Sequence, residues 1–121
     1  MDLNTVLYEQ DAAVVTIMLN RPDAMNGFDT ELRADLLAAL TRAAQDAQVR
    51  VVVLTGAGRC FSAGADLKAG FASGAEVKRQ LDEEYGPCLK AIADMPKPVI
   101  SAVNGFAAEL AWPLRWSRIW W

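Results

Sequence analysis

Residues 51–67 join a run of β-branched residues to a turn of small residues. The stretch Val51–Thr55 contains no charged residue, a pattern typical of a strand that is buried on both faces of a sheet. Gly56 and Gly58 end this strand, and residues 61–66 follow as a turn of mostly small side chains. Small residues let a backbone N–H approach a ligand closely. The turn is therefore either a ligand-binding element or an ordinary connection between a strand and a helix.

Other strands are predicted on both sides of this stretch. Val6–Glu9 and Ala13–Leu19 have the composition of a β-hairpin, with Gln10-Asp11 as its polar turn. Pro98–Val103 is a second uncharged apolar run, like the Val51–Thr55 part of the predicted strand Val49–Thr55. Because sequential strands usually pair or lie side by side, we expect these two buried strands to be neighbours in one sheet.

Two helices are predicted between the strands. Asp29 is a favourable N-cap for a helix that runs to about Ala47, and Arg33 falls off its apolar stripe. The stripe consists of Leu32, Leu36, Leu40 and Ala43. We expect this helix to serve core packing and assign it no chemistry. In the later helix Gly86-Pro87 predicts an interruption or kink, and Glu83-Glu84 is interpreted as a solvated face rather than as catalytic carboxylates.

Composition restricts the possible functions. The chain has 121 residues, 53% of them hydrophobic, which suits one domain with a real core. A net charge of −3 does not favour nucleic acid or an anionic membrane as a partner. There is no histidine, which excludes imidazole acid–base chemistry and histidine metal sites in this chain. Two cysteines form no disulfide framework, and we expect no signal peptide or membrane span, so the predicted location is cytoplasmic.

Three stretches in the same order resemble the motifs of the crotonase family, the enoyl-CoA hydratases and isomerases. They are Asn20–Asn26, Phe61–Leu67 and Lys97–Gly105. The resemblance implies an α/β fold, the crotonase-like β-β-α spiral, of which this chain holds the N-terminal half. It also implies binding of an acyl-CoA thioester whose oxygen two backbone N–H groups stabilise. Coenzyme A is then part of the substrate and no separate cofactor is implied, and the family is typically a trimer-based homo-oligomer.

The resemblance also assigns roles to single residues. Ala65 supplies the first oxyanion N–H, and preorganised backbone donors of this kind stabilise an enolate-like oxygen in a dry pocket. The second donor aligns with Leu110, in a sequence context that departs from the family. The implied CoA-binding residues are Asp23, Ala24, Asn26, Ala63, Gly64, Asp66 and Leu67. No metal site is implied, and no general base for proton transfer is identified.

The last residues depart from the family pattern. The family continues with a Gly-x-Gly turn and a helix, whereas residues 109–121 hold all 4 tryptophans of the chain. We therefore divide the chain into a crotonase-like core, residues 1–108, and a Trp-rich tail, residues 109–121. One permitted codon set for the tail, preceded by one added G, encodes Gly-Ala-Gly-Leu-Ala-Ala-Ala-Leu-Val-Ala-Asp-Leu-Val, which resembles the family. We hypothesise that a single-base loss put the tail out of frame; a genuine Trp-rich terminus is the alternative.

Three functions remain open on the sequence. The first is an enoyl-CoA hydratase/isomerase family enzyme, truncated here and inactive alone, because the family's first hydratase glutamate aligns with Pro113. The second is a non-catalytic remnant that binds CoA or a partner. The third is a nucleotide-binding α/β domain that uses Gly56-Ala57-Gly58 as a phosphate turn, although the third glycine of that fingerprint is missing.

Overall fold

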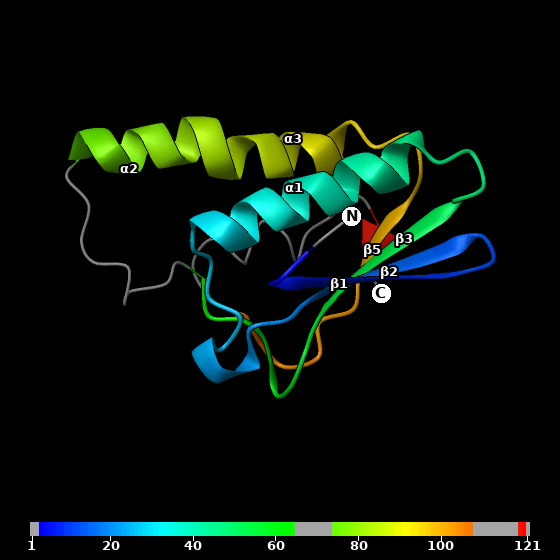
Figure 1. Ribbon diagram of the computed structural model, residues 1–121, viewed down its shortest axis with the longest axis horizontal. Coiled ribbons are helices and arrows are strands. Elements are labelled where there is room, and N and C mark those ends of the chain that lie inside the picture. The colour runs from blue at the N-terminus through cyan, green and yellow to red at the C-terminus, as the bar shows by residue number, and fades with distance from the viewer. Residues whose placement is uncertain (1–2, 65–73, 108–118, 121) are drawn as a thin grey trace.

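A five-stranded sheet with helices over one face forms most of the structure (Figure 1). The computed structural model describes residues 3–64, 74–107 and 119–120. In spatial order the strands are β1 (Val6–Asp11), β2 (Val14–Leu19), β3 (Val51–Gly56), β5 (Val99–Ser101) and β7 (Ile119–Trp120). A separate two-stranded sheet pairs β4 (Cys60–Ser62) with β6 (Phe106–Ala107).

The first two strands form the predicted antiparallel hairpin, but its turn is displaced. The pairing runs from Val6 opposite Leu19 to Asp11 opposite Val14, so the turn is not at Gln10-Asp11, as predicted, but after it. Ala12 takes the turn with a φ of 54°, a left-handed conformation that alanine adopts infrequently. The chain has no glycine or asparagine here to mark the turn in the sequence.

Helix α1 (Thr30–Gln45) is the crossover between the parallel strands β2 and β3. The predicted N-cap is confirmed, because the Asp29 carboxylate accepts a hydrogen bond of 2.8 Å from the Leu32 N–H. At the other end the Lys97 ammonium donates to two carbonyl oxygens of the last turn and the residue after it. This lysine therefore satisfies acceptors that the helix itself leaves unpaired.

The core lies between α1, the later helices and one face of the sheet. The predicted apolar stripe of α1 is fully buried, and alternate residues of β2 and β3 pack against it. In β3, Val52 and Leu54 are buried, whereas Val51, Val53 and Thr55 are half-buried. The prediction that this strand is buried on both faces is therefore wrong for the described part of the chain. The helices that the structure describes all lie over the same face of the sheet (Figure 1).

The two uncharged strands are neighbours, as predicted. Strand β3 pairs with β5 in parallel, with Val52 opposite Val99 and Leu54 opposite Ser101. On its other side β5 pairs in parallel with β7. Within the described sheet neither β3 nor β5 is an edge strand.

The later helical segment is continuous (Figure 1) but contains a π-helical turn. It consists of α2 (Gly74–Gln80), the π-turn η3 (Leu81–Tyr85) and α3 (Gly86–Ala93). The Gly86 N–H donates to the Leu81 carbonyl, and a Cβ at Gly86 would lie 2.8 Å from that oxygen. Pro87 has no N–H to donate. The predicted disturbance at Gly86-Pro87 is thus a widened turn, and the helix does not break.

Truncation of the buried stripe of α1 should destabilise the fold strongly. Leu36 is 0% exposed in the core, so Leu36→Ala should lower the free energy of unfolding by about 2–5 kcal/mol. Val77 on α2 is 44% exposed, and Val77→Ala should change the free energy of unfolding by less than about 0.5 kcal/mol. Urea denaturation measures both. Equal losses in the two variants would show that α1 does not pack as described.

Candidate functional site

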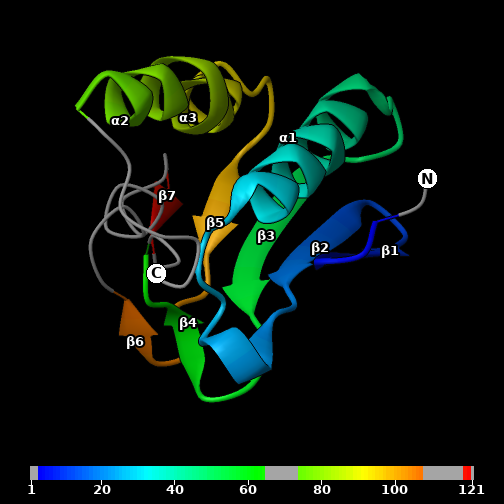
Figure 2. The ribbon, with the colours of Figure 1, turned by 60° about the vertical axis from the view of Figure 1, so that its left-hand side comes forward.

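The first two residues of the predicted turn, Phe61 and Ser62, belong to β4, so the turn itself begins at Ala63, after this strand (Figure 2). At Gly56 the chain folds back on itself so closely that a Cβ would lie 2.5 Å from the Phe61 carbonyl oxygen. Glycine is therefore required at that position. Phe61 and Ser62 are both fully buried, and Gly64 has a φ of 89°, a left-handed conformation that favours glycine.

Backbone hydrogen bonds clamp this turn onto the loop before α1. The Ala63 N–H donates to the Met25 carbonyl at 3.0 Å, and the Phe28 N–H donates to the Gly64 carbonyl at 2.6 Å. Between them, the Ser62 hydroxyl donates to the Asn26 carbonyl at 2.7 Å and accepts from the Gly64 N–H at 3.0 Å. Two segments more than thirty residues apart in sequence are thus fixed against each other up to residue 64.

Asn26 holds the same loop to the residues between β3 and β4. It is fully buried with a φ of 52°. Its side-chain amide donates to the Ala57 and Cys60 carbonyls, each at 2.9 Å, and its side-chain oxygen accepts from the Arg21 N–H at 2.8 Å. All these partners belong to the protein, and through them the Asn26 side chain shapes the loop.

Asn104 also holds this part of the chain, at Gly56 and Gly58. Its side-chain oxygen accepts from the Gly56 N–H at 3.2 Å, and its amide donates to the Gly58 carbonyl at 3.0 Å. The Ala57 N–H donates to the Leu19 carbonyl. Two amides of the Gly56–Gly58 turn are therefore already engaged. This contradicts the interpretation of that turn as a phosphate-binding nest, which needs free N–H groups.

The structure brings together some of the predicted site residues. Ala63, Gly64 and Asn26 meet at the clamped turn. Asp23 and Ala24 lie on the short 3₁₀ helix η1 (Pro22–Ala24) in the facing loop, where Asp23 is exposed. A hollow of about 270 Å³ lies beside this helix, lined by Pro22, Met25, Ala57, Arg59, Cys60 and Phe106. The remaining predicted residues lie outside the described part of the chain: Ala65, Asp66, Leu67 and Leu110.

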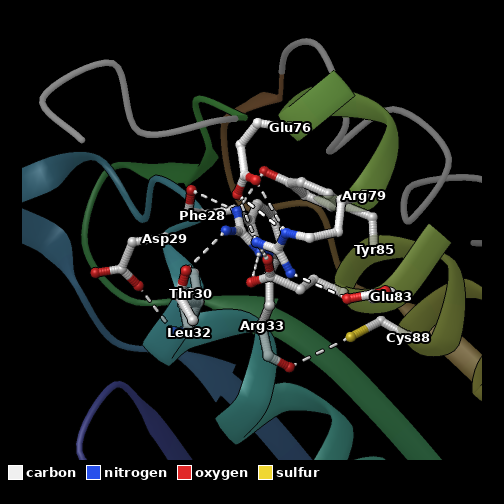
Figure 3. Close-up of polar contacts among 11 residues, drawn as sticks. Phe28, Asp29, Thr30, Leu32, Arg33, Glu76, Arg79, Glu83, Tyr85 and Cys88 are labelled. Carbon is white, nitrogen blue, oxygen red and sulfur yellow. Dashed lines mark hydrogen bonds and ion pairs between the residues drawn. The ribbon is translucent and has the colours of Figure 1, made fainter. Parts of the chain in front are cut away.

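Sequence reasoning missed a buried arginine that links α1 to the π-turn (Figure 3). The Arg33 side chain is 5% exposed. It donates to the Glu84 carboxylate at 2.9 Å, to the Tyr85 hydroxyl at 2.9 Å and to the Phe28 carbonyl at 3.2 Å. The Tyr85 ring lies edge-on to the Phe28 ring, with centroids 5.9 Å apart.

Glu84 differs from its prediction as well. Its carboxylate is 13% exposed and also accepts from Arg79 at 2.9 Å, so the solvated face predicted for Glu83-Glu84 holds for Glu83 only. Burial raises the pKa of the Glu84 carboxyl, but the hydrogen bond and charge of Arg33, together with Arg79, bring it below its ordinary value. Helical periodicity in the sequence does not reveal the pair of Arg33 and Glu84, since the two residues lie on elements far apart in the chain.

Ionisable side chains contribute little to the described turn. Burial raises the pKa of the Cys60 thiol, and burial raises the pKa of Cys88 to about 11, so both are protonated at neutral pH. Among the residues that the structure describes, no group of three or more metal-ligating side chains is placed to hold an ion. None of the described helices is long and apolar enough to cross a membrane.

The fold and this turn define a class of α/β proteins in which hydrogen bonds clamp a turn after a short buried strand onto the loop before the first helix. The family model for enoyl-CoA hydratase/isomerase matches residues 9–109. The chain therefore belongs to the enoyl-CoA hydratase/isomerase family.

Individual relatives agree with this assignment. A probable enoyl-CoA hydratase of Rhodobacter capsulatus is 45% identical over 108 residues, which cover 89% of this chain and 41% of the relative. The 1,2-epoxyphenylacetyl-CoA isomerase of Escherichia coli is 38% identical over 109 residues, covering 85% of this chain and 41% of the isomerase.

Solved structures show the same fold. An enoyl-CoA hydratase/isomerase from Xanthobacter autotrophicus superposes with a TM-score of 0.90 at 33% identity, covering 98% of this chain and 46% of that one. An enoyl-CoA hydratase from Bacillus anthracis gives a TM-score of 0.89 at 32% identity. The predicted crotonase-like α/β fold is confirmed, and the chain spans less than half the length of these relatives.

Removal of the Asn26 side chain should destabilise the whole site. Asn26→Ala leaves two buried carbonyls and one N–H without their partner and places alanine at a positive φ, so we expect a loss of about 3 kcal/mol of unfolding free energy. Asn4→Ala removes an exposed hydrogen bond to Glu31 and should cost less than about 0.5 kcal/mol. Thermal and urea denaturation measure both. A loss as small as that of Asn4→Ala would show that Asn26 does not hold the loop.

Proposed function

We propose that this chain carries part of an acyl-CoA thioester site in which backbone N–H groups stabilise an enolate-like oxygen. The observation that carries the proposal is the clamped turn of Ala63 and Gly64, which leads directly to Ala65. The family supports it, because named relatives are a probable enoyl-CoA hydratase and a 1,2-epoxyphenylacetyl-CoA isomerase. Coenzyme A enters as part of the substrate, and no separate cofactor is proposed.

The hydrogen bonds of the turn support Ala65 as the first oxyanion donor. The Ala63 N–H is used by the Met25 carbonyl and the Gly64 N–H by the Ser62 hydroxyl, so neither is available to a substrate. The next amide of the motif belongs to Ala65. Stabilisation of a developing negative charge is greatest when its donors need no reorganisation, and the clamp fixes the peptides up to this position.

The remaining assignments are part of the same proposal. Asp23 and Ala24 on η1, with Asp66 and Leu67 after the donor, are proposed to contact the CoA moiety, and Leu110 stands at the position of the second donor. The Trp-rich residues 109–121 are proposed to be a segment separate from the core of residues 1–108. A trimer-based assembly of the complete protein is proposed from the family resemblance, and a cytoplasmic location from the absence of a disulfide framework in the sequence.

Binding of an acyl-CoA tests the site. Acetoacetyl-CoA should bind to the 121-residue chain, as measured by calorimetry, and NAD should not. Gly64→Ala places a side chain at a φ of 89° and should weaken binding by roughly tenfold, or about 1.4 kcal/mol.

The matched control for this variant is Gly74→Ala. At Gly74, the first residue of α2, an added Cβ would meet no atom of the described residues within 4 Å, so binding should be unchanged. Equal affinity of both variants and the unmodified chain would argue against a site at the turn. Binding of NAD in place of acetoacetyl-CoA would favour a nucleotide site.

We further propose that the 121-residue chain alone does not hydrate crotonyl-CoA. Loss of one oxyanion donor costs about two to three decades in rate, and loss of an acid–base group about two to four, although the two need not add. Leu110 and Pro113 stand where the family has the second donor and a hydratase glutamate. The expected result is no decrease in crotonyl-CoA absorbance above background. Robust hydration would show that the residue assignments are wrong.

A further inference from the structure

We propose that Arg33 is a positioning residue that holds the backbone of Phe28, and through this residue the turn that leads to the oxyanion donor. The proposal rests on the proposed function of that turn. Arg33 lies on α1, and its partners come from the loop before α1 and from the π-turn (Figure 3). It therefore joins the helical segment 74–93 to the candidate site.

Phe28 connects Arg33 to the turn, because its carbonyl and its N–H bond to the two partners. The Phe28 carbonyl accepts from the Arg33 guanidinium at 3.2 Å in a buried environment. The Phe28 N–H donates to the Gly64 carbonyl at 2.6 Å. These two bonds belong to the peptide groups on either side of the Phe28 Cα, so Arg33 acts on the Phe28 N–H by fixing the position of this residue. The carbonyl of Gly64 belongs to the peptide bond whose nitrogen is that of Ala65, so its orientation fixes the direction of the proposed donor.

Further contacts fix the Arg33 guanidinium in place. Its Nη2 donates to the Thr30 hydroxyl at 3.2 Å, and its central carbon lies 4.5 Å from the Tyr85 ring centroid. The Glu84 carboxylate neutralises its charge, which a site with only 5% exposure requires. This planar fork of donors reaches four acceptors at once, and a lysine ammonium, a point charge on a flexible stem, cannot replace it.

The π-turn supplies two of these partners from adjacent residues. In a regular α-helix, adjacent residues point about 100° apart, whereas a π-turn has more residues per turn and brings them closer together. Glu84 and Tyr85 both contact Arg33 in this way. Gly86 permits the turn, since a Cβ there would press on the Leu81 carbonyl. The π-turn thus places Glu84 and Tyr85 within hydrogen-bond distance of Arg33.

Amide hydrogen exchange in the native 121-residue chain tests the proposal without a ligand. Arg33→Lys and Glu84→Gln should each lower the protection of the Phe28 amide by roughly tenfold or more relative to that of Val52, whose amide is bonded to the Pro98 carbonyl in the sheet. The matched control is Asp82→Asn, which removes an exposed ion pair with Lys78 in the same helical segment and should change neither amide.

Uniform loss of protection at Phe28 and Val52 would mean that Arg33 contributes only to global stability, and the proposal would be wrong. If Arg33→Lys does not fold, Tyr85→Phe decides the question. It removes one hydrogen bond to Arg33 and keeps the ring, so a smaller loss confined to Phe28 is expected. Unchanged protection of Phe28 in this folded variant would also overturn the proposal.

A second readout follows the enolate of bound acetoacetyl-CoA by its ultraviolet absorbance. Arg33→Lys should reduce the enolate fraction while the affinity for CoA itself, which lacks the acyl oxygen, is retained. Equal loss of both would indicate a structural role and contradict positioning. If the unmodified chain binds no acetoacetyl-CoA, the proposed function fails, whereas the exchange result still decides whether Arg33 holds Phe28.

Discussion

The pairing of two loops, residues 25–28 and residues 61–64, is the interaction on which the rest of the structure depends. Its central bonds join Ala63 to the Met25 carbonyl and Phe28 to the Gly64 carbonyl. The sheet brings these loops into reach, because β2 and β3 are parallel and adjacent and their carboxyl ends open on the same side. Side chains then complete the contact, with the Ser62 hydroxyl between the two backbones. A site made of backbone groups gains its precision from supports of this kind.

Polar side chains of the family motifs serve as these supports. Asn26 and Asn104 each satisfy buried or close-packed backbone groups of the segment between β3 and β4. Lys97, in the third family motif, binds the end of α1. Motif residues therefore need not touch a substrate to be required for its site. Buried polar groups that are fully paired fix one arrangement of the loops, because each alternative leaves a donor or acceptor unsatisfied.

Local patterns in the sequence predicted the elements that local physics determines. The Asp29 cap, the apolar stripe of α1 and the adjacency of β3 and β5 agree with the structure. The displaced hairpin turn at Ala12 and the burial of Arg33 were not predicted, since both depend on partners that periodicity does not show. Of the candidate site, the positions up to Gly64 are described, and those of Ala65, Asp66, Leu67 and Leu110 stay predictions.

The central claim is that a clamped turn presents a backbone donor to the oxygen of an acyl-CoA thioester. Isotope-edited infrared spectroscopy of bound crotonyl-CoA, labelled at the thioester carbonyl carbon, measures this most directly. A strong hydrogen bond from the backbone weakens the C=O bond, so the account predicts a carbonyl band at lower frequency than in water, and a return toward the aqueous value in Gly64→Ala. A bound thioester whose carbonyl band matches or exceeds the frequency in water would contradict it.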